Sequence, residues 1–154
     1  MTTTISAPGG TMVIAIANDH GGTALKQQLV AQLRDRPGVA LLDLGVDDGI
    51  SVDYPAYAAR VCTALFTGEA QRGILICGTG LGMSMAANRH PGIRAALCHD
   101  EYTARMARRH NDANVLVLGG RVTGGAVAAA LLEVWLTEPF EGGRHQRRIE
   151  MMDP

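Results

Sequence analysis

The stretch GILICGTGLGMSMAAN (73–88) places a cysteine immediately before a glycine-rich loop. Cys77 ends a short apolar run, and Gly78, Gly80 and Gly82 follow it at alternate positions. Glycine permits a sharp turn, and the backbone N–H groups exposed at such a turn stabilise an anion. The same field favours a thiolate over a thiol, so the stretch is suited to hold a base or nucleophile beside an oxyanion hole. The alternative is a cysteine that only packs as a small apolar residue.

Polar residues also follow other apolar runs. The motif NDHGG (18–22) contains Asp19, which is able to accept a hydroxyl proton, and His20, which is able to contact an anion. A loop cap and a solvated imidazole would explain the same pair. The triplets CHD (98–100) and GGR (119–121) follow two later runs.

The elements around these residues decide where they lie. Apolar runs predict five strands, at residues 12–18, 39–45, 73–77, 93–98 and 114–120. Apolar residues at helical spacing predict helices at 23–35, 54–68, 81–89, 100–111 and 125–138, and a further helix ends the tail. Asp100 is a candidate N-cap. This alternation predicts an α/β fold with a parallel sheet and helices on both faces.

Ligands of open α/β sheets bind beyond the carboxyl ends of the strands, so four of the strand-end loops are expected to form one cleft. His110 and Asn111 precede the last strand, and Arg144 and Arg148 follow the last long helix, which places both pairs at the amino edge. There they would serve as a helix C-terminus and a solvated face. A second copy of the chain could instead bring them to the cleft, where the arginines, which share one helix face, would clamp a phosphate.

Three other interpretations fit less of the pattern. A dinucleotide fingerprint requires GxGxxG after the first strand, whereas this loop reads GxGxG after the third strand and has Met83 at the third glycine position. A redox pair requires CxxC spacing, which is absent from the sequence. A metal cluster is also disfavoured, because the candidate ligands lack ligand spacing. Those ligands are Cys77, Cys98, His99 and Asp100.

The composition limits the class of protein. The chain has 154 residues, of which 47% are hydrophobic and 19% charged, and a formal net charge of −1. This balance argues against general binding to nucleic acid or acidic membranes. Three cysteines and no signal peptide or membrane-spanning run predict a cytoplasmic protein. Residues 1–11 are expected to be a disordered extension, and residues 12–154 a single domain with a helical tail.

Taken together, these motifs resemble the ribose-5-phosphate isomerase B family of sugar-phosphate isomerases. The matching segments are NDHGG, DYP, GILICGTGLGMSMAAN, HNDANVLVLGGR and EGGRHQRRIE, which span nearly all of residues 12–150. The resemblance implies a Rossmann-like three-layer α/β/α sandwich with a five-stranded parallel sheet. It also implies a homodimer with shared active sites, paired into a tetramer in some members, and reversible aldose–ketose isomerisation with no metal or other cofactor.

The resemblance also implies roles for individual residues. Cys77 resembles the base that moves a proton between C1 and C2 of the sugar. His110, from a neighbouring subunit, resembles the acid/base that opens the furanose ring, with Thr79 and Asp19 assisting. The enediolate oxygen would be held by the amides of Gly78, Gly80, Leu81 and Gly82 and by Asn111, with Tyr54 at the pocket wall. The phosphate contacts would be His20, Arg121, Arg144 and Arg148.

The expected substrate is a small sugar phosphate, with ribose 5-phosphate and ribulose 5-phosphate as the leading pair, which would place the enzyme in the pentose phosphate pathway. Relatives with similar motifs act on allose 6-phosphate, galactose 6-phosphate or tetrose phosphates, and these remain alternatives. A non-catalytic module that binds phosphorylated ligands in the same cleft is a further alternative.

Overall fold

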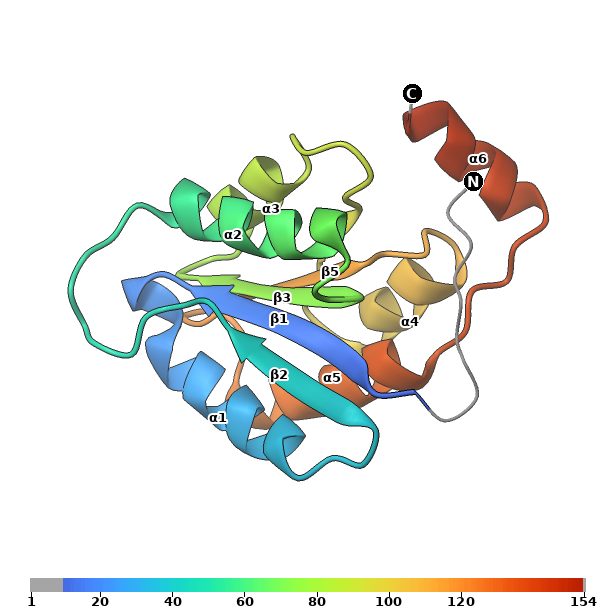
Figure 1. Cartoon of the computed structure of the whole chain (residues 1–154). Helices are drawn as coiled ribbons and strands as arrows, with labels where there is room; N and C mark the ends of the chain where they lie inside the picture. The colour runs from blue at the N-terminus through green and yellow to red at the C-terminus, as the bar shows by residue number, and fades with distance from the viewer. Residues whose placement is uncertain (1–9, 154) are drawn as a thin grey trace.

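The computed structural model describes residues 10–153, which form a parallel sheet covered by helices (Figure 1). The predicted disordered extension lies mostly outside the described residues, because residues 1–9 are not among them. All four strand pairings are parallel, and the strand order is β2-β1-β3-β5-β4. The strands are β1 (Met12–Asn18), β2 (Val39–Asp43), β3 (Arg72–Cys77), β4 (Ala95–Leu97) and β5 (Val115–Gly119).

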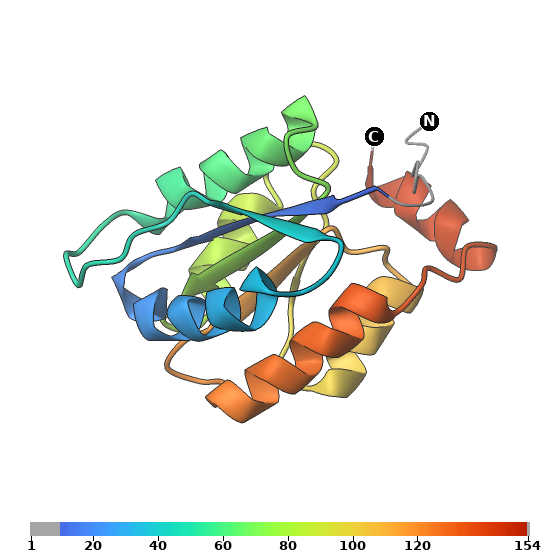
Figure 2. The same cartoon turned by 60° about the horizontal axis from the view of Figure 1, so that its bottom comes forward.

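Helices cover both faces of this sheet, as the alternating pattern predicts (Figure 2). Leu29, Ala104 and Trp135 represent the side chains of α1, α4 and α5 that bury one face. Val61 and Met83 represent those of α2 and α3, which bury the other. The fold is therefore a Rossmann-like three-layer α/β/α sandwich. The helices are α1 (Thr23–Arg34), α2 (Tyr54–Thr67), α3 (Leu81–Ala87), α4 (Glu101–Arg109), α5 (Gly125–Thr137) and α6 (Arg144–Met152).

The central strands match the predicted ranges closely, whereas β4 is shorter than predicted. β1, β3 and β5 are buried along most of their length, as expected for strands covered on both faces. The predicted strand 93–98 contracts to Ala95–Leu97, and the Arg94 N–H before it donates to the Asn114 side chain (2.8 Å).

Helix α4 begins as predicted and ends earlier. The Asp100 carboxylate accepts from the Thr103 N–H (2.7 Å) in a capping box, which confirms the predicted N-cap. The helix ends at Arg109 instead of residue 111, and His110 is its C-cap. The chain then reverses at Asp112, whose φ of 43° lies in the left-handed region.

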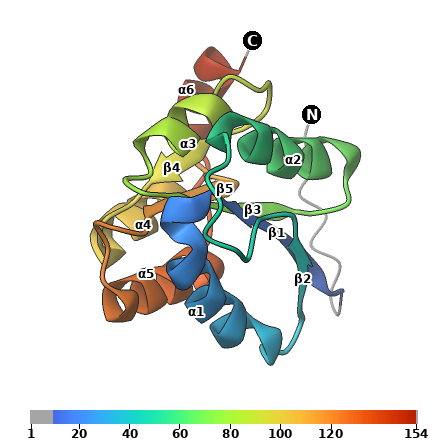
Figure 3. The same ribbon diagram turned by 90° about the vertical axis from the view of Figure 1, so that its left-hand side faces the viewer.

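The two ends of the strands face opposite sides of the molecule. Figure 3 looks onto the carboxyl edge, where β1, β3 and β5 lead into their loops. Helix α6 lies beyond the other edge, apart from the sheet (Figure 1). Within residues 10–153, no helix combines the length and the apolar character needed to cross a membrane.

Candidate active site

The β3–α3 loop folds back on the cysteine that precedes it. The Gly80 N–H donates to the Sγ of Cys77 at 3.2 Å. Gly80 has a φ of +82°, which a residue with a Cβ rarely adopts, and Leu81 then starts α3. The Leu81 N–H donates to the Oγ1 of Thr79 at 3.3 Å. An amide donor at the sulfur stabilises a thiolate, which is the chemistry that the sequence predicts for this loop.

Backbone hydrogen bonds join the loops after β1, β3 and β5. The Gly120 N–H donates to the Cys77 carbonyl (2.8 Å), and the Arg121 N–H donates to the Gly78 carbonyl (2.9 Å). The Asp19 N–H donates to the carbonyl of Ile76 (3.1 Å). These contacts hold three of the four predicted loops at one place beside Cys77.

Glycine is required where these loops touch. A Cβ added at Gly120 would lie 2.4 Å from the Gly21 carbonyl oxygen, and one added at Gly21 would lie 2.8 Å from the Gly78 nitrogen. Both distances are shorter than real Cβ contacts allow. The glycines of NDHGG and GGR therefore let the loops approach each other closely.

Two predicted site residues lie against the glycine loop. The guanidinium of Arg121 lies over Gly78, since its Nη1 would be 3.2 Å from a Cβ built there. The ring of Tyr54 covers Gly82, with its Cζ 2.6 Å from the corresponding Cβ position. The Arg121 side chain is exposed, so its charge is available to an anion beside Cys77.

Asp19 and His20 tie neighbouring backbone segments to the same edge. The Asp19 carboxylate is buried and accepts from the Gly21 N–H at 2.8 Å, so it caps the short turn His20–Gly22. The Nδ1 of His20 accepts from the Val52 N–H at 3.4 Å. This bond holds the loop before α2 near the site, and the His20 ring remains half-buried.

The three cysteines lie in different surroundings. Burial raises the pKa of the Cys62 thiol to about 11 and that of Cys98 also to about 11. Both are therefore neutral and belong to the cores on either side of the sheet. Cys77 is 5% exposed and has the Gly80 amide at its sulfur.

The predicted amino-edge residues lie far from Cys77 in the same chain. Cys77 pairs with Gly119 and Gly73 with Val115, so the length of β5, about 13 Å at 3.3 Å per residue, separates the two edges. Asn111 is exposed beyond the amino edge. Arg144 and Arg148 are exposed on α6, one turn apart.

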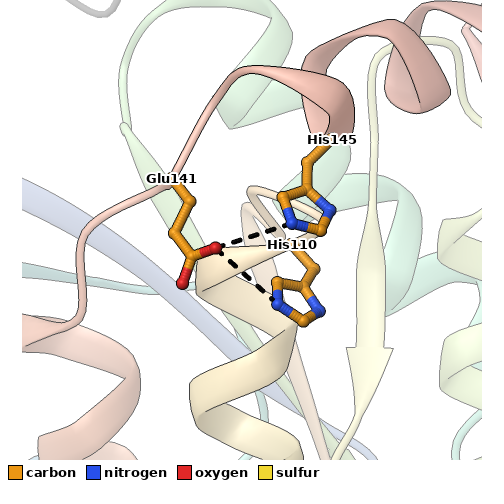
Figure 4. Close-up of side chains that lie close together, drawn as sticks. All are labelled: His110, Glu141 and His145. Atoms are coloured by element: carbon orange, nitrogen blue, oxygen red, sulfur yellow. Dashed lines mark ion pairs between the residues drawn. The ribbon is translucent and has the colours of Figure 1, made fainter.

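His110 belongs to a cluster that the sequence analysis did not predict. Its ring stacks on that of His145, with centroids 4.1 Å apart and planes inclined by 10°. Figure 4 shows Glu141 beside both rings; its Oε2 lies 3.8 Å from the Nε2 of His110 and 3.5 Å from the Nε2 of His145. The i, i+4 spacing of Glu141 and His145 is visible in the sequence, but their approach to His110 is not.

One ligand atom from each of these three residues lies within 4.8 Å of the others, which raises the question of a metal site. Zinc requires histidine nitrogens about 2.0–2.1 Å from the ion, with their lone pairs converging on it. Here the two rings are nearly parallel, with centroids 4.1 Å apart, and their Nε2 atoms lie 3.5–3.8 Å from the carboxylate. The cluster is thus arranged as a stacked pair beside a carboxylate.

A second unpredicted cluster supports the loop between β2 and α2. Lys26, the only lysine of the chain, is buried. Its Nζ lies 2.9 Å from Asp43 and 2.7 Å from Asp47. Burial lowers the pKa of Lys26, but the hydrogen bonds to Asp47 and Asp43 outweigh burial and raise it overall. The ammonium therefore stays charged and holds the β2–α2 loop, whose Val52 N–H donates to His20.

Comparison with known proteins shows the family of the chain. A family model described as Ribose/Galactose Isomerase matches residues 14–152. The chain belongs to the ribose-5-phosphate isomerase B family. It is 48% identical to ribose-5-phosphate isomerase B of Escherichia coli (strain K12), over 89% of this chain and 91% of that protein.

One further match is to a solved structure, and another is to a relative that is named for a different substrate. The structure of Clostridium thermocellum ribose-5-phosphate isomerase B matches with a TM-score of 0.90 and 48% identity, over 92% of this chain and 95% of that one. The D-erythrulose-4-phosphate isomerase of Pectobacterium atrosepticum is 41% identical, over 89% of this chain and 90% of that protein. The chain is therefore a sugar-phosphate isomerase, and its substrate is a small sugar phosphate.

Proposed function

We propose that this enzyme interconverts ribose 5-phosphate and ribulose 5-phosphate through an enediolate, with Cys77 as the base. The observation that carries the proposal is the Gly80 N–H at the Cys77 sulfur, at the place where three strand-end loops meet. An amide-stabilised thiolate at this position is suited to take a proton from carbon. The identity to relatives named for ribose 5-phosphate supports the choice of substrate.

The isomerisation moves two protons, one from C2 to C1 and one from O2 to O1. In the open-chain aldose the Cys77 thiolate takes the proton from C2, and the C2–H electrons form the C1=C2 bond while O1 becomes an oxyanion. The thiol then returns the proton to C1, and the hydroxyl proton moves from O2 to O1, which leaves a ketone at C2. Asp19 and Thr79 lie at this edge, where they would assist the ring opening that precedes this step.

The loop contains donors for the oxyanion. The N–H groups of Gly80 and Leu81 are engaged by Cys77 and Thr79. Those of Gly78 and Gly82 have no protein acceptor among residues 10–153 and are free to bind a ligand. In other enzymes one such donor contributes about 3–4 kcal/mol to transition-state stabilisation.

Ring opening requires a residue from a second chain. A furanose opens when its ring oxygen gains a proton while the anomeric hydroxyl loses one, and a histidine performs this transfer well near neutral pH. We assign it to His110 of the partner subunit, because the His110 of the same chain lies at the opposite edge. The homodimer would then combine His20 and Arg121 of one chain with Arg144 and Arg148 of the other at the phosphate, and Asn111 of the other chain would contact the enediolate oxygen.

A panel of aldose phosphates tests the substrate. The purified protein is given ribose 5-phosphate, erythrose 4-phosphate, allose 6-phosphate and galactose 6-phosphate, and ketose formation is measured. We expect the highest kcat/KM with ribose 5-phosphate. A preference for the C4 sugar would favour the activity for which the Pectobacterium relative is named. The absence of turnover on every sugar would reject the isomerase assignment of Cys77 and leave a binding module.

A further inference from the structure

The stacked ring beside His110 is almost fully buried, whereas His110 itself is not. The side chain of His145 is 7% exposed and that of His110 is 37% exposed. His145 and Ile149 are the two buried residues of α6, so His145 belongs to the face that packs this helix against the chain. The exposed ring of His110 thus lies on a ring that the fold holds in place.

The backbone fixes the approach of the two rings. The Glu141 N–H donates to the Arg109 carbonyl at 3.0 Å, which attaches the chain before α6 to the end of α4, next to His110. Gly142 and Gly143 follow with φ of +66° and +58°, a left-handed pair that returns the chain into α6. His145 is therefore placed over His110 by a main-chain hydrogen bond and a glycine turn.

Burial, and then the charges around the pair, favour the neutral form of the buried ring. Burial lowers the pKa of His145, and the positive charges of His110, Arg144 and Arg148 lower it further, while Glu141 opposes the shift. On the α4 side, Arg109 lies 3.9 Å from Glu141 and also pairs with Glu138. His110 thus stacks on an uncharged aromatic plane near neutral pH.

We propose that His145 is a positioning residue for His110, whose imidazole it holds by stacking in the orientation needed to open a sugar ring. This inference rests on the proposed function, in which His110 serves the active site of a partner subunit. A catalytic group must be held close to its productive geometry, and a displacement of about 1 Å costs as much as 10²-fold in rate. His145 itself touches no reacting atom in this scheme.

The two directions of the reaction separate ring opening from proton transfer. Ribose 5-phosphate is a furanose and must be opened before it isomerises. Ribulose 5-phosphate carries its phosphate on O5 and has no five-membered ring to open, so its C1 protons exchange with solvent deuterium through the Cys77 step alone. Consumption of ribose 5-phosphate and C1 exchange of ribulose 5-phosphate, both followed by NMR in the same dimeric protein, therefore report on different steps.

The test uses His145→Ala, which removes the ring, and His145→Phe, which keeps an aromatic plane without nitrogens. With His145→Ala we expect consumption of ribose 5-phosphate to fall roughly 10- to 100-fold while C1 exchange stays near the wild-type rate. With His145→Phe we expect consumption to recover most of that loss. Gln146→Ala, an exposed neighbour on α6, is the control and should change neither rate.

Three outcomes would overturn the inference. Unchanged consumption in His145→Ala would show that the stack is not needed, and an equal fall in exchange would show a general structural defect. A His145→Phe enzyme as slow as His145→Ala would show that the stacked plane is not the cause. If the wild-type enzyme neither consumes ribose 5-phosphate nor exchanges ribulose 5-phosphate, the proposed function itself fails, which is a separate result.

Discussion

The two edges of the sheet are built in different ways. At the carboxyl edge, main-chain hydrogen bonds and glycine contacts hold Cys77, Gly78 and Gly120 together. At the amino edge, a main-chain hydrogen bond and the Gly142–Gly143 turn only bring α6 to the end of α4, and the contacts to His110 itself are made by the side chains of His145 and Glu141. The first edge presents backbone donors, a sulfur and the side chains of His20 and Arg121, and the second presents the imidazole of His110 and the guanidinium groups of α6.

In the proposed mechanism, this difference divides the chemistry between the two edges. Proton transfer at carbon needs a base and donors at fixed positions, which a backbone framework provides. Ring opening needs a titratable side chain, which His110 of the amino edge would provide, and the phosphate would be bound by charged side chains of both edges. Because β5 separates the edges within one chain, a complete site requires the amino edge of a second copy, as proposed above.

The largest effect is expected from Cys77→Ala, which removes the proposed base of the carboxyl edge. Loss of a general base lowers rates by about 10²–10⁴-fold, so we expect both ribose 5-phosphate turnover and ribulose 5-phosphate exchange to fall by that factor. Calorimetry with ribose 5-phosphate should still detect binding. Cys98→Ala removes a buried thiol from the core and is the control for loss of a cysteine. Exchange that persists in Cys77→Ala would contradict the assignment.

The proposal that Cys77 of one chain and His110 of another chain form one active site is tested with His110→Ala. Alone, this variant should lose about 10²-fold in ribose 5-phosphate turnover. Refolding it with an equal amount of Cys77→Ala should form mixed dimers with one intact site, and random pairing should restore about one quarter of the wild-type activity. If the mixture stays as inactive as its components, the two residues do not meet across a dimer.

Arg121→Met tests the phosphate contact of the carboxyl edge. A charge-assisted hydrogen bond contributes about 1.5–3 kcal/mol, so we expect KM for ribose 5-phosphate to rise roughly 10- to 100-fold with a smaller change in kcat. Inhibition by inorganic phosphate should weaken in parallel. Arg147→Met, an exposed arginine of the tail with no assigned role, is the control. A large fall in kcat at constant KM would instead place Arg121 in the chemical step.

Gly120→Ala tests the backbone framework of the same edge. Its Cβ would lie 2.4 Å from the Gly21 carbonyl oxygen, so the loops must separate. Overpacking of this kind costs about 1–3 kcal/mol, which urea denaturation should detect as a lower free energy of unfolding. Gly49→Ala meets no atom within 4 Å and is the matched control. Equal stability of the two variants would show that the loops yield without cost.

The last prediction concerns Cys98, one of the two cysteines outside the proposed site. Burial raises the pKa of Cys98 from 9.0 to about 11, so the folded state favours the neutral thiol. Its contribution to stability is complete below about pH 9 and is lost as the pH rises through 11. Between pH 8 and 11, wild type should lose about 2 kcal/mol more free energy of unfolding than Cys98→Ala. Parallel losses in both proteins would contradict this.

Much of the candidate site was predictable from the sequence because its signals are local. The end of β3 at Cys77, the glycines after it and the N-cap at Asp100 all depend on adjacent residues, and the structure confirms their positions. Glu141, His145 and the Lys26 cluster were missed. Their contacts join residues that lie 17 to 35 positions apart in the sequence. A hydrophobic pattern along the chain does not predict contacts at such separations.

Local patterns in the chain were enough to predict the order of strands and helices and the cysteine–glycine loop, since hydrophobic periodicity and turn preference depend on neighbouring residues. The family resemblance came from the motifs, such as NDHGG and HNDAN, and not from this periodicity. Only the tertiary structure decided the strand order β2-β1-β3-β5-β4, which brings residues 19–22, 77–82 and 119–121 to one edge. It also decided that His110 stacks on His145 at the other edge. Strands and helices become neighbours because the whole chain must bury both faces of the sheet. The residues of a single segment do not specify which other segments will lie beside it.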